Sequence, residues 1–249
     1  MKSGIFIIGL LFSCFCSCGQ PKILIAAASD LRFAMDSMIL VFNQSNSGNV
    51  EVTYGSSGKL TEQIIQGAPF DMLFSADLSY PEQLKKENKT GSEIYPYAKG
   101  RIVIWSKKLD PQQLQMKALT NASIKKVSIA NPDHAPYGKR AMESLSHYKL
   151  LTNVKSKLVY GENISQAAQF ITSGAADIGI IALSLAVSPN MKKENGKYYL
   201  IPEKSHTALI QGAMITRHGK NNPLANSFFK FIQGDKATGI LKHFGLSKS

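Results

Sequence analysis

Residues 51–63 read Glu-Val-Thr-Tyr-Gly-Ser-Ser-Gly-Lys-Leu-Thr-Glu-Gln, and this stretch decides the fold because a strand passes into a helix through a turn of glycines and serines. The β-branched and aromatic residues before the turn are typical of a strand. Leu60 and Ile64 follow at helical spacing, so we expect a helix that begins near Ser57. Such a helix leaves its first backbone N–H groups unpaired at the positive end of its dipole, and the Ser56 and Ser57 hydroxyls add donors at the same place. The turn is therefore a candidate anion site.

Other interpretations of the turn stay open at this point. A serine before a helix often only caps that helix by accepting hydrogen bonds from its amides. The turn is not a P-loop, because the lysine form of that motif has four residues between its glycines, whereas Gly55 and Gly58 enclose two. It also falls one residue short of the Gly-x-Ser-x-Gly elbow of serine hydrolases. A hydrolase that uses a serine of this turn is thus a weaker alternative, and for His134, which lies in a later turn, bonding to backbone groups is the simpler interpretation.

Length and composition describe an ordinary globular protein. The 249 residues suffice for one large domain, or for two of about 100 to 150 residues each. The hydrophobic share of 44% and the charged share of 18% exclude disorder as a description of the whole chain. The formal net charge is +12, but the basic residues are scattered in pairs and form no stripe interleaved with aromatic residues. We therefore expect no nucleic-acid partner, and we interpret the charge as an aid to solubility with mild attraction of anions.

The N-terminus carries the pattern of a secretion signal. Lys2 precedes an apolar run over residues 4–12 that is too short for a permanent membrane span, so residues 1–18 are predicted to be a signal peptide. All three cysteines lie within it, which excludes an internal disulfide in the mature chain. The cluster resembles a bacterial lipoprotein signal, which implies a lipid on Cys18, or alternatively on Cys14. We expect a domain anchored on the periplasmic or cell-surface side of a bacterial membrane, with an ordinary cleaved signal as the alternative.

The strand, polar turn and helix of the opening stretch have counterparts on both sides. Residues 22–28 form a continuous apolar run, as in a strand covered on both faces, and Ser29 and Asp30 follow before a helical pattern. Residues 70–75 form another short strand-like run. This alternation predicts an α/β fold with a doubly wound parallel sheet, in which ligands bind beyond the carboxyl ends of the strands. Ser29 is expected to face the ligand, whereas the Asp30 carboxylate is expected to cap its own helix and point away.

The second half of the chain repeats this architecture. Strand-like runs at residues 127–130, 157–160 and 177–181 alternate with helical patterns. The turn at residues 131–138 contains two prolines and a glycine, and the turn at residues 161–163 leads into another helix. We therefore expect a second group of polar turns like those of the first half.

Two extended runs are expected to connect the halves. Residues 100–106 would cross from the first half to the second, and residues 207–216 would cross back. The sequence thus predicts a hinged molecule of two lobes. Lobe I would consist of residues 22–99 and 209–249, and lobe II of residues 100–208.

Five motifs together resemble a known family. They look like those of the periplasmic molybdate-binding proteins of molybdate ABC importers, and they occur in that family's order over residues 22–248. Each motif alone is weak, whereas the set is specific. The motifs are Ala26–Ser29, Tyr54–Gly58 with Leu60, Gly67–Asp71, Ser75–Asp77 and Asn131–Gly138.

The resemblance implies a periplasmic-binding-protein-like fold of type II, with two doubly wound lobes joined by a two-strand hinge. Molybdate or tungstate would bind between the lobes of a monomer, and an ABC permease would be the partner. Carried over by motif, Ser29 and Ser57 would bind from lobe I with hydroxyls and backbone amides. Tyr137 and Ile164 would donate backbone amides from lobe II. One branch of the family has a tyrosine hydroxyl where this chain has Ala182, so that contact is absent here. Possible additional binding residues are Asp30, Ser56, Gly58 and Asn163.

Electrostatics agrees with this assignment. The predicted turns contain no lysine or arginine apart from Lys59 at the rim, so neutral donors would hold the anion. Charge-assisted hydrogen bonds contribute about 1.5–3 kcal/mol each, and several together can offset the dehydration of a dianion. Sulfate or a small carboxylate stays an alternative ligand, although carboxylate sites usually employ arginine. We predict no catalytic residue, cofactor or metal-cation site, because no cysteine or histidine pair has metal-ligand spacing.

Overall fold

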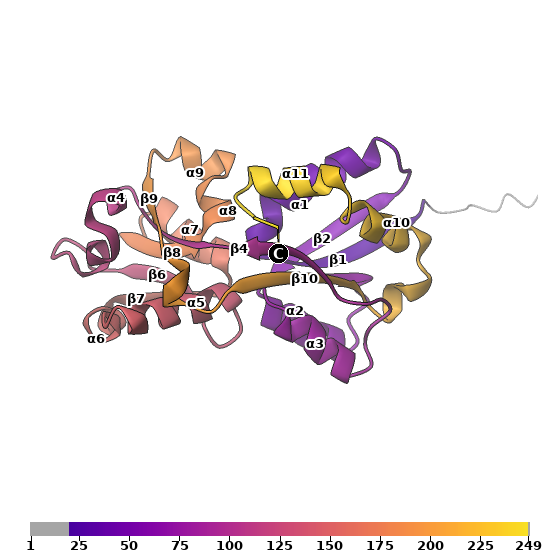
Figure 1. Cartoon of the computed structure of the whole chain (residues 1–249), viewed down its shortest axis with the longest axis horizontal. Helices are drawn as coiled ribbons and strands as arrows, with labels where there is room; N and C mark the ends of the chain where they lie inside the picture. Colours follow the sequence, from indigo (N-terminus) through magenta and orange to yellow (C-terminus); the bar gives the residue numbers. More distant parts are fainter. Residues whose placement is uncertain (1–19, 249) are drawn as a thin grey trace, which may run out of the picture.

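The computed structural model describes residues 20–248, which form two mixed β-sheets flanked by helices (Figure 1). The predicted signal peptide and both candidate lipidation sites, Cys14 and Cys18, lie outside the described residues. Within residues 20–248, no helix has the length and apolar character that crossing a membrane requires.

The first sheet consists, in spatial order, of β2 (Asn49–Gly55), β1 (Lys22–Ala28), β3 (Met72–Ser75), β10 (Leu209–Ile215) and β4 (Tyr95–Gly100). The prediction of a parallel sheet is right for β2, β1 and β3, which are parallel to one another. It is wrong for β10, which runs antiparallel to both of its neighbours. The sheet is mixed because β10 enters it on the return of the chain from the second sheet.

Helices cover both faces of the first sheet. They are α1 (Arg32–Asn43), α2 (Ser57–Ile65), α3 (Ser79–Lys86), α10 (Pro223–Phe231) and α11 (Asp235–His243), with the 3-10 turns η1 (Ser29–Leu31) and η5 (His218–Asn221). Side chains alternate along β1, so Ile23 and Ile25 pack in the core under α1, α10 and α11, whereas Ala26 packs in the core under α2 and α3. Figure 1 shows α11 and the pair α2 and α3 on opposite sides of this sheet.

The second sheet consists, in spatial order, of β7 (Leu158–Gly161), β6 (Val127–Ala130), β8 (Ile178–Ala182), β5 (Ile102–Ser106) and β9 (Lys197–Leu200). β6 is parallel to β7 and β8, whereas β5 is antiparallel to β8 and β9. The core of this half includes the buried Trp105. Its helical elements are α4 (Pro111–Leu114), η2 (Gln115–Thr120), α5 (Pro136–His147), α6 (Leu151–Val154), η3 (Lys155–Lys157), α7 (Ile164–Thr172), α8 (Leu183–Ala186), α9 (Pro189–Lys193) and η4 (Glu203–Ser205).

The chain passes between the two sheets twice. The first crossing is Arg101, between β4 and β5, and the second is residues 201–208, between β9 and β10. From here on, lobe I means the first sheet with its helices, and lobe II means the second sheet with its helices. The predicted lobe boundaries and the movement of the lobes as two separate bodies stay predictions.

Candidate functional site

A small cavity lies between the lobes, where β1 and β2 end and where α5 and α7 begin. Its volume is about 10 Å³, which is about the space that one water molecule requires. The residues predicted to bind the anion, Ser29, Ser57, Tyr137 and Ile164, all line it. The full wall consists of Ala28, Ser29, Asp30, Gly55, Ser56, Ser57 and Ala76 from lobe I, and of Ala135, Pro136, Tyr137 and Ile164 from lobe II.

Lobe I contributes two serine hydroxyls to the wall. Ser57 is the first residue of α2, and its buried Oγ accepts a hydrogen bond from the backbone N–H of Ala76 at 3.0 Å. Because that bond uses only a lone pair, the hydroxyl hydrogen of Ser57 can be donated to an anion. Ser29 Oγ instead donates to Asn163 Oδ1 across the lobes at 3.1 Å. A hydroxyl contact from Ser29 to an anion therefore requires this hydrogen to turn away from Asn163.

Lobe II contributes the N-termini of two helices. Tyr137 is the second residue of α5, after Pro136, and Ile164 is the first residue of α7. Backbone amides at these positions have no carbonyl partner within their helix. The side chain of Asn163 caps α7 by accepting a bond from Gln166 N at 3.1 Å, so the cap does not use the Ile164 amide. Both predicted amide donors thus stand at helix starts that border the cavity.

The electrostatics of the cavity favour an anion. The helices α2, α5 and α7 all begin at its wall and direct the positive ends of their dipoles toward it. None of the residues that line the cavity is lysine, arginine or histidine. Backbone amides, hydroxyls and helix dipoles are therefore what this cavity offers to an anion, and the binding of an anion here stays a prediction.

Asp30 departs from this pattern, because it brings a buried carboxyl group to the cavity wall. The prediction that it caps its own helix is wrong, since η1 and α1 both lack a side-chain cap in the described structure. Asp30 Oδ2 instead accepts hydrogen bonds from Tyr137 Oη at 2.9 Å and from Gln211 Nε2 at 2.7 Å. Asp30 Oδ1 is buried and has no hydrogen-bond partner among the described residues. Asp30 therefore connects β10 and α5 beside the cavity.

Burial determines the ionisation of this group of side chains. It raises the pKa of Asp30 to about 6, although the bonds from Gln211 and Tyr137 and the backbone N–H of Asp30 itself oppose the shift. Burial and the negative charge of Asp30 raise the pKa values of Tyr97 and Tyr137 well above their usual range. Gly100 at the end of β4 makes the close packing possible, because a Cβ there would lie 2.5 Å from Tyr137 Oη.

Ser56, His134 and Glu162 have the composition of a hydrolase triad. His134 Nδ1 lies 2.9 Å from Ser56 Oγ, and His134 Nε2 lies 3.4 Å from Glu162 Oε2. The ring is turned the opposite way from that of a serine protease, in which Nε2 contacts the serine and Nδ1 the acid. The Gly58 amide, a candidate donor to a reaction oxyanion or to a bound anion, is used by the backbone carbonyl of His134 at 2.9 Å. Ser56 and Gly58 therefore join α2 to lobe II, and the geometry gives the hydrolase alternative no support.

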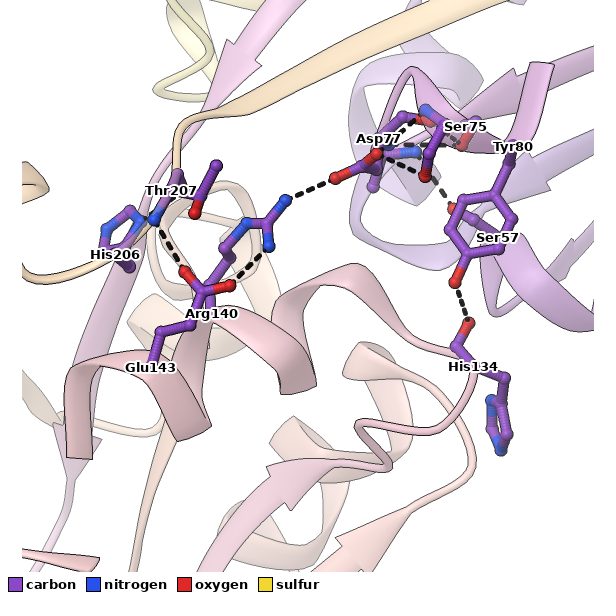
Figure 2. A network of polar contacts seen from close by, with 11 residues as sticks. Ser57, Ser75, Asp77, Tyr80, His134, Arg140, Glu143, His206 and Thr207 are labelled. Carbon is purple, nitrogen blue, oxygen red and sulfur yellow. Dashed lines mark hydrogen bonds and ion pairs between the residues drawn. The ribbon is translucent and has the colours of Figure 1, made fainter. Parts of the chain in front are cut away.

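A further set of contacts joins the lobes on the side of α5. Figure 2 shows Arg140 of α5 directed at Asp77 of lobe I, with which it forms an ion pair. Arg140 also pairs with Glu143 at 2.7 Å, and Glu143 accepts a hydrogen bond from Thr207 N in the second crossing at 2.6 Å. The side chains of Arg140 and Asp77 are only 10% and 17% exposed, so water screens their attraction less than at the open surface. The lobes are therefore held in contact around the cavity.

Asn163, a predicted additional site residue, does not line the small cavity. It borders a larger groove of about 650 Å³ between α1 of lobe I and the helices α7, α8 and α9 of lobe II. Arg32, Lys193 and Glu194 also line this groove, so it carries charges of both signs. The described residues of this groove therefore give it no single sign of charge.

Gln211 and Ser165 were not predicted to take part in the site. Gln211 is fully buried within the otherwise apolar strand β10, and a lone polar residue in such a run signals a buried hydrogen-bond partner. Ser165 Oγ donates to the backbone carbonyl of Ser29 at 2.9 Å. Ser165 gives no comparable signal, because a serine in the first turn of a helix is ordinary.

Two mixed sheets with helices, joined by two crossings beside a cavity, are the architecture of an extracytoplasmic solute-binding protein. Residues 23–247 match the family of bacterial extracellular solute-binding proteins, and the chain belongs to this family. It is thus a transport component rather than an enzyme, as the sequence predicts.

Individual relatives narrow the comparison. The chain is 35% identical over 231 residues to the molybdate-binding protein ModA of Azotobacter vinelandii, covering 92% of this chain and 91% of the relative. It is 28% identical over 248 residues to the molybdate-binding protein ModA of Rhodobacter capsulatus, covering 98% and 96% of the two chains. The solved periplasmic molybdate-binding protein of Azotobacter vinelandii matches with a TM-score of 0.85 and 29% identity, over 91% of this chain and 99% of that one. The predicted family resemblance and the predicted periplasmic-binding-protein fold of type II are confirmed.

We expect Asp30→Asn to stabilise the protein more at about pH 7.5 than at about pH 4, because only the wild-type side chain ionises. The pKa of Asp30 is about 6 in the folded state and 3.8 ordinarily, so between these values the folded state binds more protons. The wild-type protein therefore loses stability as the pH rises through this window, by about 3 kcal/mol for a shift of about two units. Urea unfolding at several pH values measures the difference.

The control for this prediction is Glu62→Gln, which removes the charge of an exposed carboxylate of α2 in the same way. The control is expected to shift stability by less than about 0.5 kcal/mol at every pH. A free-energy difference between Asp30→Asn and wild type that does not change with pH would contradict the raised pKa of Asp30.

Proposed function

We propose that this protein captures molybdate or tungstate outside the cytoplasmic membrane and delivers it to an ABC importer. The observation that carries the proposal is the cavity between the lobes, where α2, α5 and α7 begin beside Ser29 and Ser57 and where no cationic side chain lines the wall. Family membership supports solute capture as the class of function. The relatives that are themselves named molybdate-binding proteins support the choice of ligand.

In this proposal, neutral donors from both lobes replace the water around the dianion. Ser29 and Ser57 donate hydroxyl and backbone hydrogens from lobe I, and Tyr137 and Ile164 donate backbone hydrogens from lobe II. Each hydrogen bond to a charged ligand contributes about 1.5–3 kcal/mol, so four or more of them support tight binding. A site that contains only hydrogen-bond donors favours a fully deprotonated oxyanion. A protonated oxygen of the ligand carries an O–H group, which would face another donor and find no acceptor.

The proposal includes opening and closure of the lobes. A tetrahedral oxyanion is larger than the water-sized cavity of about 10 Å³, so the guest enters when the lobes part and the walls then close on it. Arg101 and residues 201–208 are the segments that would bend. Closure brings the amides of Tyr137 and Ile164 to a guest first held by lobe I, and it excludes the water that would weaken these bonds.

The cellular setting follows from the sequence and the family. An extracellular solute-binding protein is exported, which agrees with the predicted signal peptide at residues 1–18. A lipid on Cys18, or on Cys14, would keep the domain at the membrane surface. In this proposal the protein acts there as a monomer. The partner there would be an ABC permease that accepts the closed, liganded form.

We expect calorimetry on the purified protein to show sub-micromolar binding of molybdate and tungstate and much weaker binding of sulfate and phosphate. Ser57→Ala and Ser29→Ala should each weaken molybdate binding about tenfold or more, because each removes a charge-assisted hydrogen bond of about 1.5–3 kcal/mol. The matched control is Ser173→Ala, since Ser173 is exposed at the end of α7 away from the cavity. Tight sulfate binding without molybdate heat would replace the proposed ligand, and unchanged affinity in both serine variants would refute the site.

We expect Asp77→Asn to speed the release of bound molybdate about fivefold or more, although Asp77 does not line the cavity. The substitution removes the ion pair with Arg140 that joins the lobes, and such a pair contributes about 1 kcal/mol. The amide can keep the role of Asp77 Oδ1, which accepts a hydrogen bond from Ser79 N at 2.9 Å, so lobe I itself stays intact. Stopped-flow displacement of molybdate by tungstate measures the release rate. Glu93→Gln breaks the exposed pair with Lys85 within lobe I as a control, and equal rates for both variants would contradict the closing role of the Asp77 pair.

A further inference from the structure

Asp30 is a buried carboxyl group in the wall of a cavity suited to an anion. It is 1% exposed, and it lies beside Ser29 at the end of β1. A carboxylate here would repel a dianion in the cavity, at a place where burial keeps water from screening the two charges. The surrounding structure must therefore either pair the charge of Asp30 or favour its neutral form.

The groups around Asp30 do not pair its charge. Tyr137 of α5 and Gln211 of β10 donate neutral hydrogen bonds to Oδ2. Tyr97 of β4 is the other titratable group that interacts with it, and Ser184 of α8 donates to its backbone carbonyl at 2.9 Å. None of the groups that shift the pKa of Asp30 is positively charged. The backbone N–H of Asp30 itself also favours the charged form, but no positively charged group compensates the negative charge.

The other carboxyl oxygen fits a proton. Oδ1 is buried and has no hydrogen-bond partner among the described residues, while Oδ2 already accepts two hydrogen bonds. A protonated carboxyl group has one O–H donor and keeps acceptor capacity on its second oxygen. With the proton on Oδ1, the bonds from Tyr137 and Gln211 to Oδ2 stay as they are, and Asp30 becomes a hydrogen-bond donor among the residues that line the cavity.

We propose that Asp30 binds the oxyanion as a neutral acid, so that this protein takes up one proton from solvent with each dianion it captures. The proton forms an O–H bond at Asp30 Oδ1, and no other covalent bond changes. Asp30 is then a specificity-determining residue, because its O–H donor requires an acceptor oxygen, rather than a protonated one, on the ligand. The inference rests on the proposed function, since it concerns the same cavity and an oxyanion ligand.

Proton uptake has a direct thermodynamic signature. Burial already places the pKa of Asp30 at about 6, and a bound dianion raises it further. Above the pKa of the free protein, each captured dianion must bring a proton, so the dissociation constant for tungstate is expected to increase about tenfold per pH unit. Asp30→Asn offers an amide that is neutral at every pH, and its dissociation constant is expected to stay constant over the same range.

The test is titration calorimetry with sodium tungstate between about pH 6 and about pH 9, on wild type, Asp30→Asn and the exposed control Glu62→Gln. Repeating the wild-type titration at about pH 8 in two buffers of different ionisation enthalpy counts the protons taken up, with about one expected. The control variant is expected to follow the wild-type slope. Any protonation of tungstate itself would appear equally in Asp30→Asn, so the difference between the two curves belongs to Asp30.

The outcomes separate the two proposals. If no oxyanion binds at any pH, the proposed function fails. If tungstate binds but the affinity of wild type does not change with pH and no proton is taken up, the function stands and the neutral-acid role of Asp30 is wrong. A wild-type slope in Asp30→Asn would also overturn that role, because another group would then be titrating. Should Asp30→Asn not fold, the proton count on the wild-type protein still decides.

Discussion

Backbone N–H groups without a partner inside their own helix are the constraint on which the rest of this molecule depends. They occur at the starts of α2, α5 and α7, and the first residues of these three helices border the same cavity. Neutral donors bind an anion strongly only where water is excluded. For that reason the two lobes have to meet, and the contacts of His134 with Ser56 and of Arg140 with Asp77 bring them together.

The parts of the fold that could be predicted are those that local sequence determines. The run 51–63 contains its own strand, turn and helix signals, and the prolines of residues 131–138 mark the turn before α5. The direction and position of β10 could not be predicted in this way. Its partners, β3 and β4, come from more than one hundred residues earlier in the chain, and nothing within residues 209–215 states which strands they join.

The same division between local and distant partners applies to the site. Family resemblance supplied Ser29, Ser57, Tyr137 and Ile164, which line one cavity. The local rule failed for Asp30, because a cap was the simplest use of a carboxyl group before a helix. Its real partners are 107 and 181 residues away in the chain. A polar residue whose neighbours are decided by the meeting of two lobes cannot be assigned from its own segment.

The order of strands in the first sheet has a consequence for synthesis. Lobe II is one uninterrupted stretch of chain, so a nascent polypeptide can complete that sheet before its C-terminal part has been translated. Lobe I cannot do so, because β10 lies between β3 and β4. A chain truncated before Leu209 would leave two strands with unpaired edges, which are templates for aggregation. The first sheet is therefore complete only after β10 has been synthesised, within the last forty or so residues of the sequence.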